Sequence, residues 1–345
     1  MVVDEKYMRR ALQLARLGAG RTSPNPMVGA VIVGPDGNII GEGWHRQCGQ
    51  AHAEVNAVAT VTDVDLLRDS TLYVTLEPCS HYGKTPPCAR LIIERGIPRV
   101  VVGTLDPFVK VAGRGVKMLQ EAGIEVVVGV LEQACRDLNR RFMTAHTTGR
   151  PWVQLKWAQT ADGFIALPPL AGENPLRMST PLTMSLMHRQ RALCDAIVVG
   201  AATACIDNPS LTTRYWPGRS PLRVVLSRNL SIPSSLNLLT DGLPTVVYNG
   251  VKNEKQGPVE YVKLDTTHPH SWLVDLYRRG VTSVMVEGGL NVLQQLIAAG
   301  TWDEARVEIS PRRVGQGVPA PAFPAPVAQR YTIDGNTIFH LLNRH

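Results

Sequence analysis

The sequence predicts an α/β protein made of two domains of similar size. The chain has 345 residues, which exceeds the length of a typical single domain. Runs rich in Val and Ile alternate with amphipathic segments along its whole length, a pattern typical of helices that cover a mixed sheet. This alternation stops at TTGRP (147–151) and then starts again. We therefore expect domains at residues 1–147 and 151–345.

The first half contains a regular series of predicted elements. The predicted helices cover residues 8–17, 52–60, 88–95, 115–122 and 131–144. The predicted strands cover residues 27–33, 39–44, 71–76, 99–103 and 125–130. The turn GPDG (34–37) separates the first two strands.

The second half predicts a further sheet. The predicted strands cover residues 151–158, 195–200, 222–227, 244–249 and 283–289, with helical or loop segments between them. The segment 311–327 is rich in Pro and Gly, so we expect no regular structure there.

Composition and charge narrow the class of protein. The formal net charge is +7, but residues 1–150 hold 18 Lys and Arg against 15 Asp and Glu, and the remainder 18 against 14. Without a basic stripe we expect a small anionic substrate and no nucleic-acid partner. No apolar run approaches the ~18 residues that span a bilayer, and the first residues do not form a secretory signal, so we expect a cytoplasmic protein without a membrane partner. The oligomeric state stays open, a homo-oligomer included.

Four residues in two short stretches form a candidate metal site. AHAEVNA (51–57) contains His52 and Glu54, and EPCSHYGKTPPC (77–88) contains Cys79 and Cys88. One imidazole and two thiolates are ligands that zinc prefers, and a catalytic zinc retains its fourth position for water. A carboxylate beside such a water is suited to general acid/base catalysis, which we assign to Glu54.

The positions of the cysteines favour metal binding. Each follows proline, and proline is common in the first turn of a helix, so we expect both Cys79 and Cys88 at helix starts, where the dipole favours a thiolate. A structural zinc with Cys48 or His81 as fourth ligand stays possible. The other four cysteines, residues 48, 135, 194 and 205, are expected to pack as thiols.

His-x-Glu followed by Pro-Cys and a second Cys is the signature of zinc nucleobase deaminases, although here eight residues separate the cysteines. Together with TSPNPMVGAVIV (22–33) and GEGWH (41–45), these motifs resemble the deaminase half of the RibD family of bifunctional riboflavin-biosynthesis enzymes. The resemblance implies a cytidine-deaminase-like fold, an α/β/α layered domain, and zinc-dependent hydrolytic deamination of a diaminopyrimidinone that carries a phosphoribosylamino group. It also implies that the substrate contacts Asn25, His45, His81 and Lys84.

The second half resembles the reductase half of the same family. On its own, the glycine pair in VEGGLNVL (286–293) is typical of an ordinary strand-to-helix turn and only weakly indicates phosphate binding. The stretches QLKWAQTADGFIA (154–166), DAIVVGAATACIDNPSLTTR (195–214) and VMVEGGLNVL (284–293) carry the resemblance. It implies a dihydrofolate-reductase-like fold and NADPH-dependent reduction of the ribosyl to the ribityl side chain. The implied cofactor contacts are Ala158, Thr203, Asp207, Gly288, Gly289, Leu290 and Asn291, and the implied substrate contacts are Arg191, Leu211, Arg214 and Glu287.

Two departures from the family pattern keep alternatives open. NPLRMSTP (174–181) stands where the family usually has Ser-x-Trp-Ile, and TADG (160–163) where it usually has Ser-Leu-Asp-Gly. One alternative is therefore a deaminase with an impaired reductase. Others are a nucleoside, tRNA-adenosine or cytosine deaminase with an unrelated partner domain, and a zinc-stabilised binding module without activity.

Overall fold

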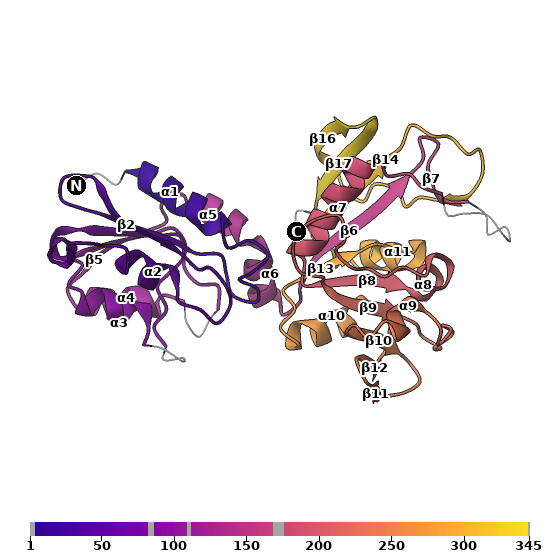
Figure 1. The fold of residues 1–345 in the computed structure, drawn as a ribbon, viewed down its shortest axis with the longest axis horizontal. Coiled ribbons are helices and arrows are strands. Elements are labelled where there is room, and N and C mark those ends of the chain that lie inside the picture. Colours follow the sequence, from indigo (N-terminus) through magenta and orange to yellow (C-terminus); the bar gives the residue numbers. More distant parts are fainter. Residues whose placement is uncertain (1–3, 82–85, 109–111, 168–175, 344–345) are drawn as a thin grey trace. The chain divides into compact units, whose positions relative to one another are not determined.

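The computed structural model describes residues 4–81, 86–108, 112–167 and 176–343. The chain divides into two compact units, residues 1–148 and 149–345 (Figure 1). This division falls within the TTGRP stretch (147–151). Among the described residues, we find no helix with the length and apolar character needed to cross a membrane.

The first unit contains one five-stranded mixed sheet in the order β2-β1-β3-β4-β5. Strand β1 pairs antiparallel with β2 and β3, whereas β3, β4 and β5 are parallel. In chain order the elements are α1 (Glu5–Arg16), β1 (Gly29–Val33), β2 (Ile39–Trp44), α2 (Ala53–Val58), a 3-10 turn (Val64–Asp69), β3 (Thr71–Val74), α3 (Cys88–Glu94), β4 (Arg99–Val102), α4 (Arg114–Glu121), β5 (Glu125–Val128), α5 (Glu132–Leu138) and α6 (Arg140–Thr148).

Helices cover both faces of this sheet, as predicted. In Figure 1, α1 and α5 lie on one face and α2, α3 and α4 on the other. Because side chains alternate along a strand, Ala30 and Ile32 of β1 pack in the core under α2 and α3, and Val31 and Val33 pack against α1. The unit is thus a three-layer α/β/α sandwich.

The single helix predicted for residues 131–144 is wrong, because two helices, α5 and α6, occupy this region. The break falls at Asn139, which is 3% exposed. Its side-chain amide accepts from the N–H of Met27 and donates to the Met27 carbonyl, both at 2.8 Å. A long-range pair of hydrogen bonds therefore overrides the local helical pattern.

The second unit contains a ten-stranded sheet in the order β11-β12-β10-β9-β8-β13-β6-β14-β17-β16, and a separate two-stranded pair, β15-β7. In chain order the elements are β6 (Trp152–Gln159), β7 (Phe164–Ala166), α7 (Pro181–Leu193), β8 (Ala196–Gly200), α8 (Ala201–Asp207), β9 (Leu222–Leu226), α9 (Asn237–Thr240), β10 (Thr245–Asn249), β11 (Glu254–Gln256), β12 (Val259–Lys263), α10 (Pro269–Arg278), β13 (Ser283–Val286), α11 (Leu290–Ala298), β14 (Glu304–Ile309), β15 (Val318–Pro319), β16 (Val327–Ile333) and β17 (Asn336–Leu342).

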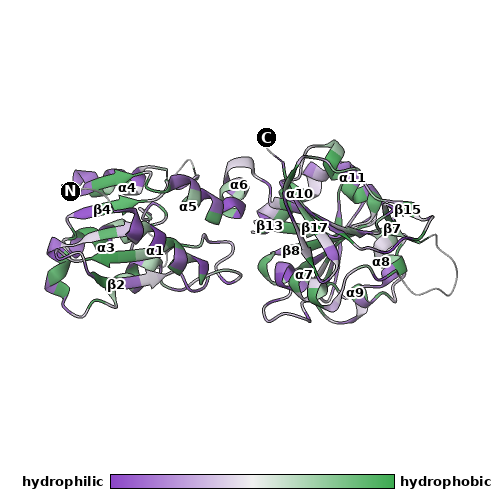
Figure 2. Ribbon diagram, turned by 90° about the horizontal axis from the view of Figure 1, so that it is seen from above, coloured by the Kyte–Doolittle hydropathy of each residue, from purple (hydrophilic) through white to green (hydrophobic). Residues whose placement is uncertain are grey.

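Both faces of the central strands are apolar and covered. Ala196 and Val198 of β8 join the core formed with α10 and α11, and Ile197 and Val199 join the core formed with α8 and α9. Figure 2 shows hydrophobic residues along the inner strands of each unit, whereas the helices carry both hydrophobic and hydrophilic residues. A parallel strand that is buried on both faces lacks the apolar/polar alternation of a surface strand.

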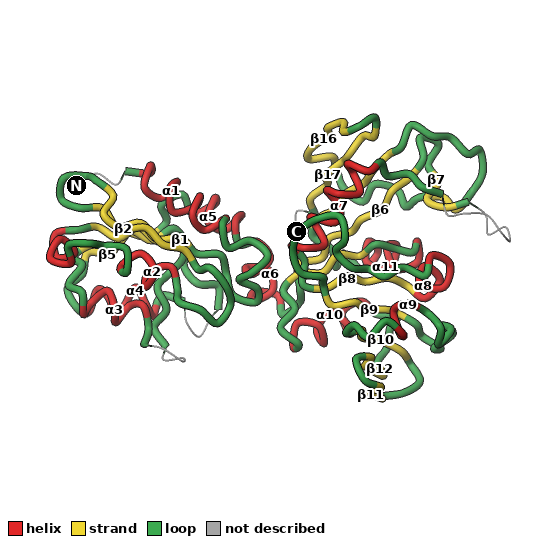
Figure 3. Tube along the Cα trace, in the orientation of Figure 1, coloured by secondary structure: helices red, strands yellow, loops and turns green. Residues whose placement is uncertain are grey.

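Five of the strands described in the second unit are predicted from the sequence, and seven are not. The segment 311–327, expected to lack regular structure, is largely irregular and is drawn mostly as loop in Figure 3, but Val318–Pro319 form β15 and Val327 begins β16. The two-residue strand β15 within it pairs with β7, and the Asp162 carboxylate accepts the backbone N–H groups of Val314 and Gly315 at 3.0 and 2.8 Å. This Pro-rich segment is thereby attached to the turn that follows β6.

Candidate active sites

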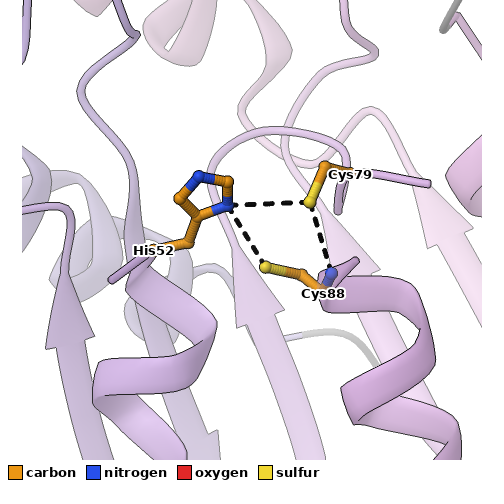
Figure 4. Close-up of side chains that lie close together, drawn as sticks. All are labelled: His52, Cys79 and Cys88. Carbon is orange, nitrogen blue, oxygen red and sulfur yellow. Dashed lines mark hydrogen bonds between the residues drawn. The ribbon is translucent and has the colours of Figure 1, made fainter. Parts of the chain in front are cut away.

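Three predicted zinc ligands lie together in the first unit. His52 Nδ1, Cys79 Sγ and Cys88 Sγ lie within 4.8 Å of one another. In Figure 4 the three side chains point toward a common centre from the start of α2, the loop after β3 and the start of α3. The donor set of one imidazole and two sulfurs fits a zinc ion that keeps a fourth position open.

Local packing explains why His52 lies here. His52 is the N-cap residue of α2, and this helix is in direct contact with β2 because Gly43 has no side chain. A Cβ on Gly43 would lie 2.3 Å from the backbone nitrogen of Ala57 and 2.5 Å from the carbonyl oxygen of Ala53. Glycine therefore allows the close approach that sets the start of α2 beside the cysteines.

The prediction that both cysteines begin helices is correct for Cys88 and wrong for Cys79. Cys88 is the first residue of α3, whereas Cys79 lies in a loop without regular structure. The Cys79 sulfur nevertheless accepts a hydrogen bond from the Cys88 backbone N–H at 3.2 Å. The backbone carbonyl of Cys79 accepts one from the Ala89 N–H at 3.1 Å. The loop is thus bonded to the first turn of α3, and the sulfur lies at the N-terminus of that helix.

The two sulfurs differ in proton affinity. The hydrogen bond from the Cys88 thiol is the largest cause that lowers the pKa of Cys79, to about 4. The same bond, together with burial, raises the pKa of Cys88. A divalent cation bound here would displace the Cys88 proton and meet two thiolates.

Glu54 lies in the first turn of α2 and is 3% exposed. Burial raises its pKa to about 7, and the negative charge of Cys79 adds to this shift, while His52 opposes it. A carboxyl group whose pKa lies near neutrality can both accept and donate a proton. Its position beside the ligand cluster fits the predicted acid/base role.

Two of the predicted substrate residues lie beside the cluster. The ring of His45, which is 2% exposed, packs edge-on against His52 with ring centroids 5.5 Å apart. Its Nδ1 donates to the Ala51 carbonyl at 3.1 Å, which leaves Nε2 to accept from the Asn25 amide at 3.3 Å. The structure thus brings Asn25, His45 and His52 together.

The remaining predictions near this site have different outcomes. His81 is exposed, and Lys84 lies outside the described residues. Within the described part of the chain, neither Cys48 nor His81 joins the ligand cluster. Cys48 and Cys205 are exposed, so the packing prediction is wrong for them, whereas Cys135 and Cys194 are buried as predicted.

Sequence reasoning missed Glu77, which fixes the loop that carries Cys79. Glu77 is 5% exposed, and its carboxylate accepts four backbone N–H groups, from Asp106, Gly113, Gly115 and Val116, at 2.8 to 3.3 Å. It therefore joins the cysteine loop to the start of α4. The available sequence signal for this role is an acidic residue directly before Pro-Cys.

In the second unit, the topology of the sheet creates a binding site. The parallel strands β8 and β13 are neighbours, but the chain continues from them into helices α8 and α11, which pack on opposite faces. The crevice at the carboxyl ends of such a strand pair is the usual ligand site of α/β sheets. A cavity of about 1270 Å³ lies here.

All seven predicted cofactor contacts line this cavity: Ala158, Thr203, Asp207, Gly288, Gly289, Leu290 and Asn291. The Gly288–Gly289 pair connects β13 to α11, and Gly288 has a φ of +123°, which favours glycine. A Cβ on Gly289 would lie 3.0 Å from Thr203 Oγ1. The glycines thus leave backbone accessible at the helix start, which fits the phosphates of a dinucleotide.

The predicted substrate contacts are only partly gathered in this cavity. Glu287 lines it, whereas Arg191, Leu211 and Arg214 are absent from its lining. Arg191 nevertheless binds Glu287 through two hydrogen bonds of 2.7 Å, in which Nε and Nη2 donate to the two carboxylate oxygens. Burial of Glu287 would raise its pKa, but the charge and hydrogen bonds of Arg191 outweigh this effect and hold the pKa at about 2.

Lys156 and residues 177–179 also line the cavity and were not predicted to contact a ligand. Lys156 lies on β6, and burial lowers its pKa while the charges of Glu287 and Glu308 oppose that shift. A single lysine within the apolar stretch QLKWAQ was the available signal. Residues 177–179 belong to the segment that departs from the family pattern, so this departure lies at the cavity wall.

Comparisons with known proteins assign each half of the chain to a known domain family. The family model of the cytidine and deoxycytidylate deaminase zinc-binding region matches residues 1–104, and that of the RibD C-terminal domain matches residues 151–330. The riboflavin biosynthesis protein RibD of Aquifex aeolicus (strain VF5) is 40% identical over 323 residues, which cover 92% of this chain and 89% of that protein. The corresponding protein of Escherichia coli (strain K12) is 35% identical, with 90% and 89% covered. The chain belongs to the RibD family.

Solved structures lead to the same family. The diaminohydroxyphosphoribosylaminopyrimidine deaminase/5-amino-6-(5-phosphoribosylamino)uracil reductase of Thermotoga maritima superposes with a TM-score of 0.88 at 37% identity, covering 99% of this chain and 98% of that one. RibD of Acinetobacter baumannii gives a TM-score of 0.88 at 30% identity, with 99% of both chains covered. The predicted fold classes of both halves are confirmed. The protein is a bifunctional riboflavin-biosynthesis enzyme with a zinc-dependent deaminase half and an NADPH-dependent reductase half.

Proposed function

We propose that the first unit deaminates 2,5-diamino-6-(5-phosphoribosylamino)pyrimidin-4(3H)-one and that the second unit reduces the ribosyl group of the product to ribityl. The observation that carries this proposal is the convergence of His52, Cys79 and Cys88 with Glu54 buried beside them. The similarity to the Thermotoga maritima enzyme, whose two activities act on these compounds, supports the choice of substrate. We assign residues 1–147 to the deaminase and 151–345 to the reductase.

In the deaminase, His52, Cys79 and Cys88 would hold the zinc ion. Zinc supplies Lewis acidity and makes water a nucleophile at neutral pH. Glu54 takes a proton from the attacking water and returns protons to the ring nitrogen and the leaving amine, which its pKa of about 7 permits. Asn25 and His45 orient the pyrimidine beside the metal, and His81 and Lys84 are assigned to the same substrate.

In the reductase, the crevice between β8 and β13 would hold NADPH, which supplies the hydride. Thr203, Asp207 and the Gly288–Gly289 turn bind the dinucleotide, together with Ala158, Leu290 and Asn291. Arg191, Leu211, Arg214 and Glu287 bind the substrate, the arginines through its phosphate. The ion pair with Arg191 keeps Glu287 ionised and fixed in direction.

An assay that follows the two reactions separately tests this proposal. Purified protein of known zinc content receives the diaminopyrimidinone, and ammonia release and NADPH oxidation are recorded in parallel. We expect ammonia first and NADPH oxidation only afterwards. If deamination proceeds and NADPH is not consumed even when the deaminated compound is supplied, the reductase assignment is wrong. If neither signal is seen with zinc bound, the substrate assignment is wrong.

The alternative of an impaired reductase has one structural observation in its favour. Arg177 and Met178 line the cavity from the segment in which the family usually has Trp-Ile. A titration of NADPH, followed by its fluorescence, separates loss of binding from loss of hydride transfer. A cytoplasmic location and the lack of a nucleic-acid partner remain predictions from the sequence, and the oligomeric state stays open.

A further inference from the structure

Helix α7 holds the segment 211–214 through two hydrogen bonds. His188 Nδ1 accepts the backbone N–H of Arg214 at 2.9 Å. One turn further along, Arg191 Nη1 donates to the carbonyl of Thr212 at 3.1 Å. Residues three apart lie on the same face of a helix, so both bonds come from one side of α7. Arg191 also binds Glu287, but His188 has had no part in the site so far.

The environment of His188 is suited to accepting a hydrogen bond. The side chain is 2% exposed, and its ring packs edge-on against Tyr215, with centroids 4.8 Å apart and planes at 76°. Because Nδ1 accepts from a backbone N–H, the imidazole must be neutral, with its proton on Nε2. Burial is the main cause that lowers its pKa to about 4, and the charges of Arg191 and Arg214 add to this shift.

The segment that His188 contacts adopts an uncommon backbone conformation. Leu211, the first residue of the segment, has a φ of +53°. Positive φ is rare for a branched, non-glycine residue such as leucine, and it persists only where the surroundings impose it. Leu211 is 2% exposed and packs in the core with Ala204 and Val225. The core fixes one end of the segment, and α7 fixes the other.

We propose that His188 is a positioning residue of the reductase site, whose Nδ1 fixes the backbone at Arg214 and thereby aims the 211–214 segment at the substrate. This inference rests on the proposed function, in which Leu211 and Arg214 contact the substrate. His188 is absent from the cavity lining, and in this proposal it acts through the backbone of Arg214. Its loss should therefore weaken substrate binding and leave NADPH binding intact.

A matched pair of variants tests this role. In His188→Asn the side-chain oxygen takes the place of Nδ1 as acceptor, whereas His188→Leu leaves the Arg214 N–H unpaired. We expect His188→Leu to raise the reductase KM for the deaminated substrate about tenfold, and His188→Asn to change it less than about threefold. The dissociation constant of NADPH, measured by fluorescence, should stay within about twofold in both. Ammonia release by the other half of the same chain is the internal control.

Three outcomes overturn the inference. One is an unchanged KM in His188→Leu, and another is an equal loss in His188→Asn, because the acceptor would then be irrelevant. The third is weaker NADPH binding in proportion to KM, which indicates general damage to the unit. The Asn variant keeps the test valid if the Leu variant does not fold.

A double variant separates this inference from the proposed function. If His188 acts through Arg214, adding His188→Leu to Arg214→Met should raise KM by less than about threefold beyond Arg214→Met alone, because the two residues share one effect. Independent, multiplying effects contradict the positioning role. An unchanged KM in Arg214→Met refutes the proposed role of Arg214 and the inference with it. A raised KM in Arg214→Met together with an unchanged KM in His188→Leu refutes the inference but not the proposed role of Arg214.

Discussion

Each unit contains a buried glutamate at its site, but the two carboxyl groups are held in opposite ways. Glu54 is 3% exposed and Glu287 has a side-chain exposure of 9%. Burial raises the pKa of Glu54 to about 7, and among its resolved interactions only His52 contributes an opposing positive charge. For Glu287 burial acts in the same direction, yet the bidentate pair with Arg191 lowers its pKa to about 2.

The difference shows how the surroundings determine the chemistry of one residue type. A carboxyl group that titrates near neutrality can exchange protons during turnover, as a hydrolytic deamination requires. A carboxylate in a bidentate ion pair with arginine keeps its charge and its direction. Glu54 is therefore suited to moving protons and Glu287 to positioning groups.

Replacing Glu54 should give the largest effect. Glu54→Gln keeps the size of the side chain but removes the titrating proton, so we expect deamination to fall by about 10²- to 10⁴-fold. Zinc content, measured by atomic absorption, should remain that of the wild-type protein, because Glu54 is not a proposed ligand. The reductase, assayed with the deaminated substrate, serves as control. Retained deamination would show that Glu54 is not the acid/base group.

These two sites also differ in how far the sequence could predict them. The zinc ligands and Glu54 lie in two short stretches with a specific spacing, so their convergence could be predicted without a structure. Pro-Cys, which is typical of a helix start, predicts a helix at Cys79, but this residue lies in a loop. The loop instead continues to Cys88 and is fixed by Glu77, whose four hydrogen bonds reach residues 106–116.

The contacts of the second unit are dispersed along the chain and were predicted less completely. The pairing of Arg191 with Glu287 joins residues 96 positions apart, and no local pattern indicates it. Strand β14, which has the sequence EARVEI, is not among the predicted strands. Arg306 and Glu308 of this strand are 3% and 0% exposed, and Arg306 Nη1 lies 3.6 Å from Glu308 Oε2.

Removing the arginine that pairs with Glu287 should destabilise the second unit. Arg191→Met leaves a carboxylate largely buried without its cation, which typically costs about 3–5 kcal/mol of unfolding free energy. We expect the second unit to lose stability by that order, measured by urea unfolding followed by tryptophan fluorescence, since five of six tryptophans lie in this unit. Arg191→Met combined with Glu287→Gln should recover part of the loss. If the double variant is no more stable than the single one, the uncompensated charge is not the cause.

Glu77 of the first unit is a third buried carboxylate with which Glu287 can be compared. It has backbone N–H partners where Glu287 has an arginine. Glu77→Gln retains one acceptor oxygen and turns the other acceptor into a donor that faces N–H groups. We expect a loss of about 1–3 kcal/mol in the unfolding free energy of this unit, together with weaker zinc retention against a chelator. Glu94→Gln, at an exposed position on α3, is the control. Equal behaviour of the two variants would contradict the proposed role of Glu77 in holding the cysteine loop.

The smallest expected effect is the pH dependence of stability that His188 causes. The same arginine that keeps Glu287 ionised helps to keep His188 neutral. Burial is the largest cause of its lowered pKa of about 4, Arg191, Arg214 and Lys156 add to it, and Glu287 opposes it. The unfolded chain has a histidine pKa of about 6.5, so between these values the unfolded state binds the extra proton. The contribution of His188 to stability is therefore fully present above pH ~6.5 and is lost as the pH falls toward 4.

Urea unfolding at pH 7 and pH 5 measures this contribution. We expect the wild-type protein to lose more unfolding free energy between these two pH values than His188→Asn, which has no proton to gain. The difference should stay below the limit of about 1.4 kcal/mol per pH unit for a single proton. In chains that also carry Arg191→Met, the difference between His188 and His188→Asn should be smaller, because one of the charges that disfavour the imidazolium is gone. An equal pH dependence in wild type and His188→Asn would mean that the pKa of His188 is the same in the native and unfolded states, which would contradict a native imidazole that burial keeps neutral.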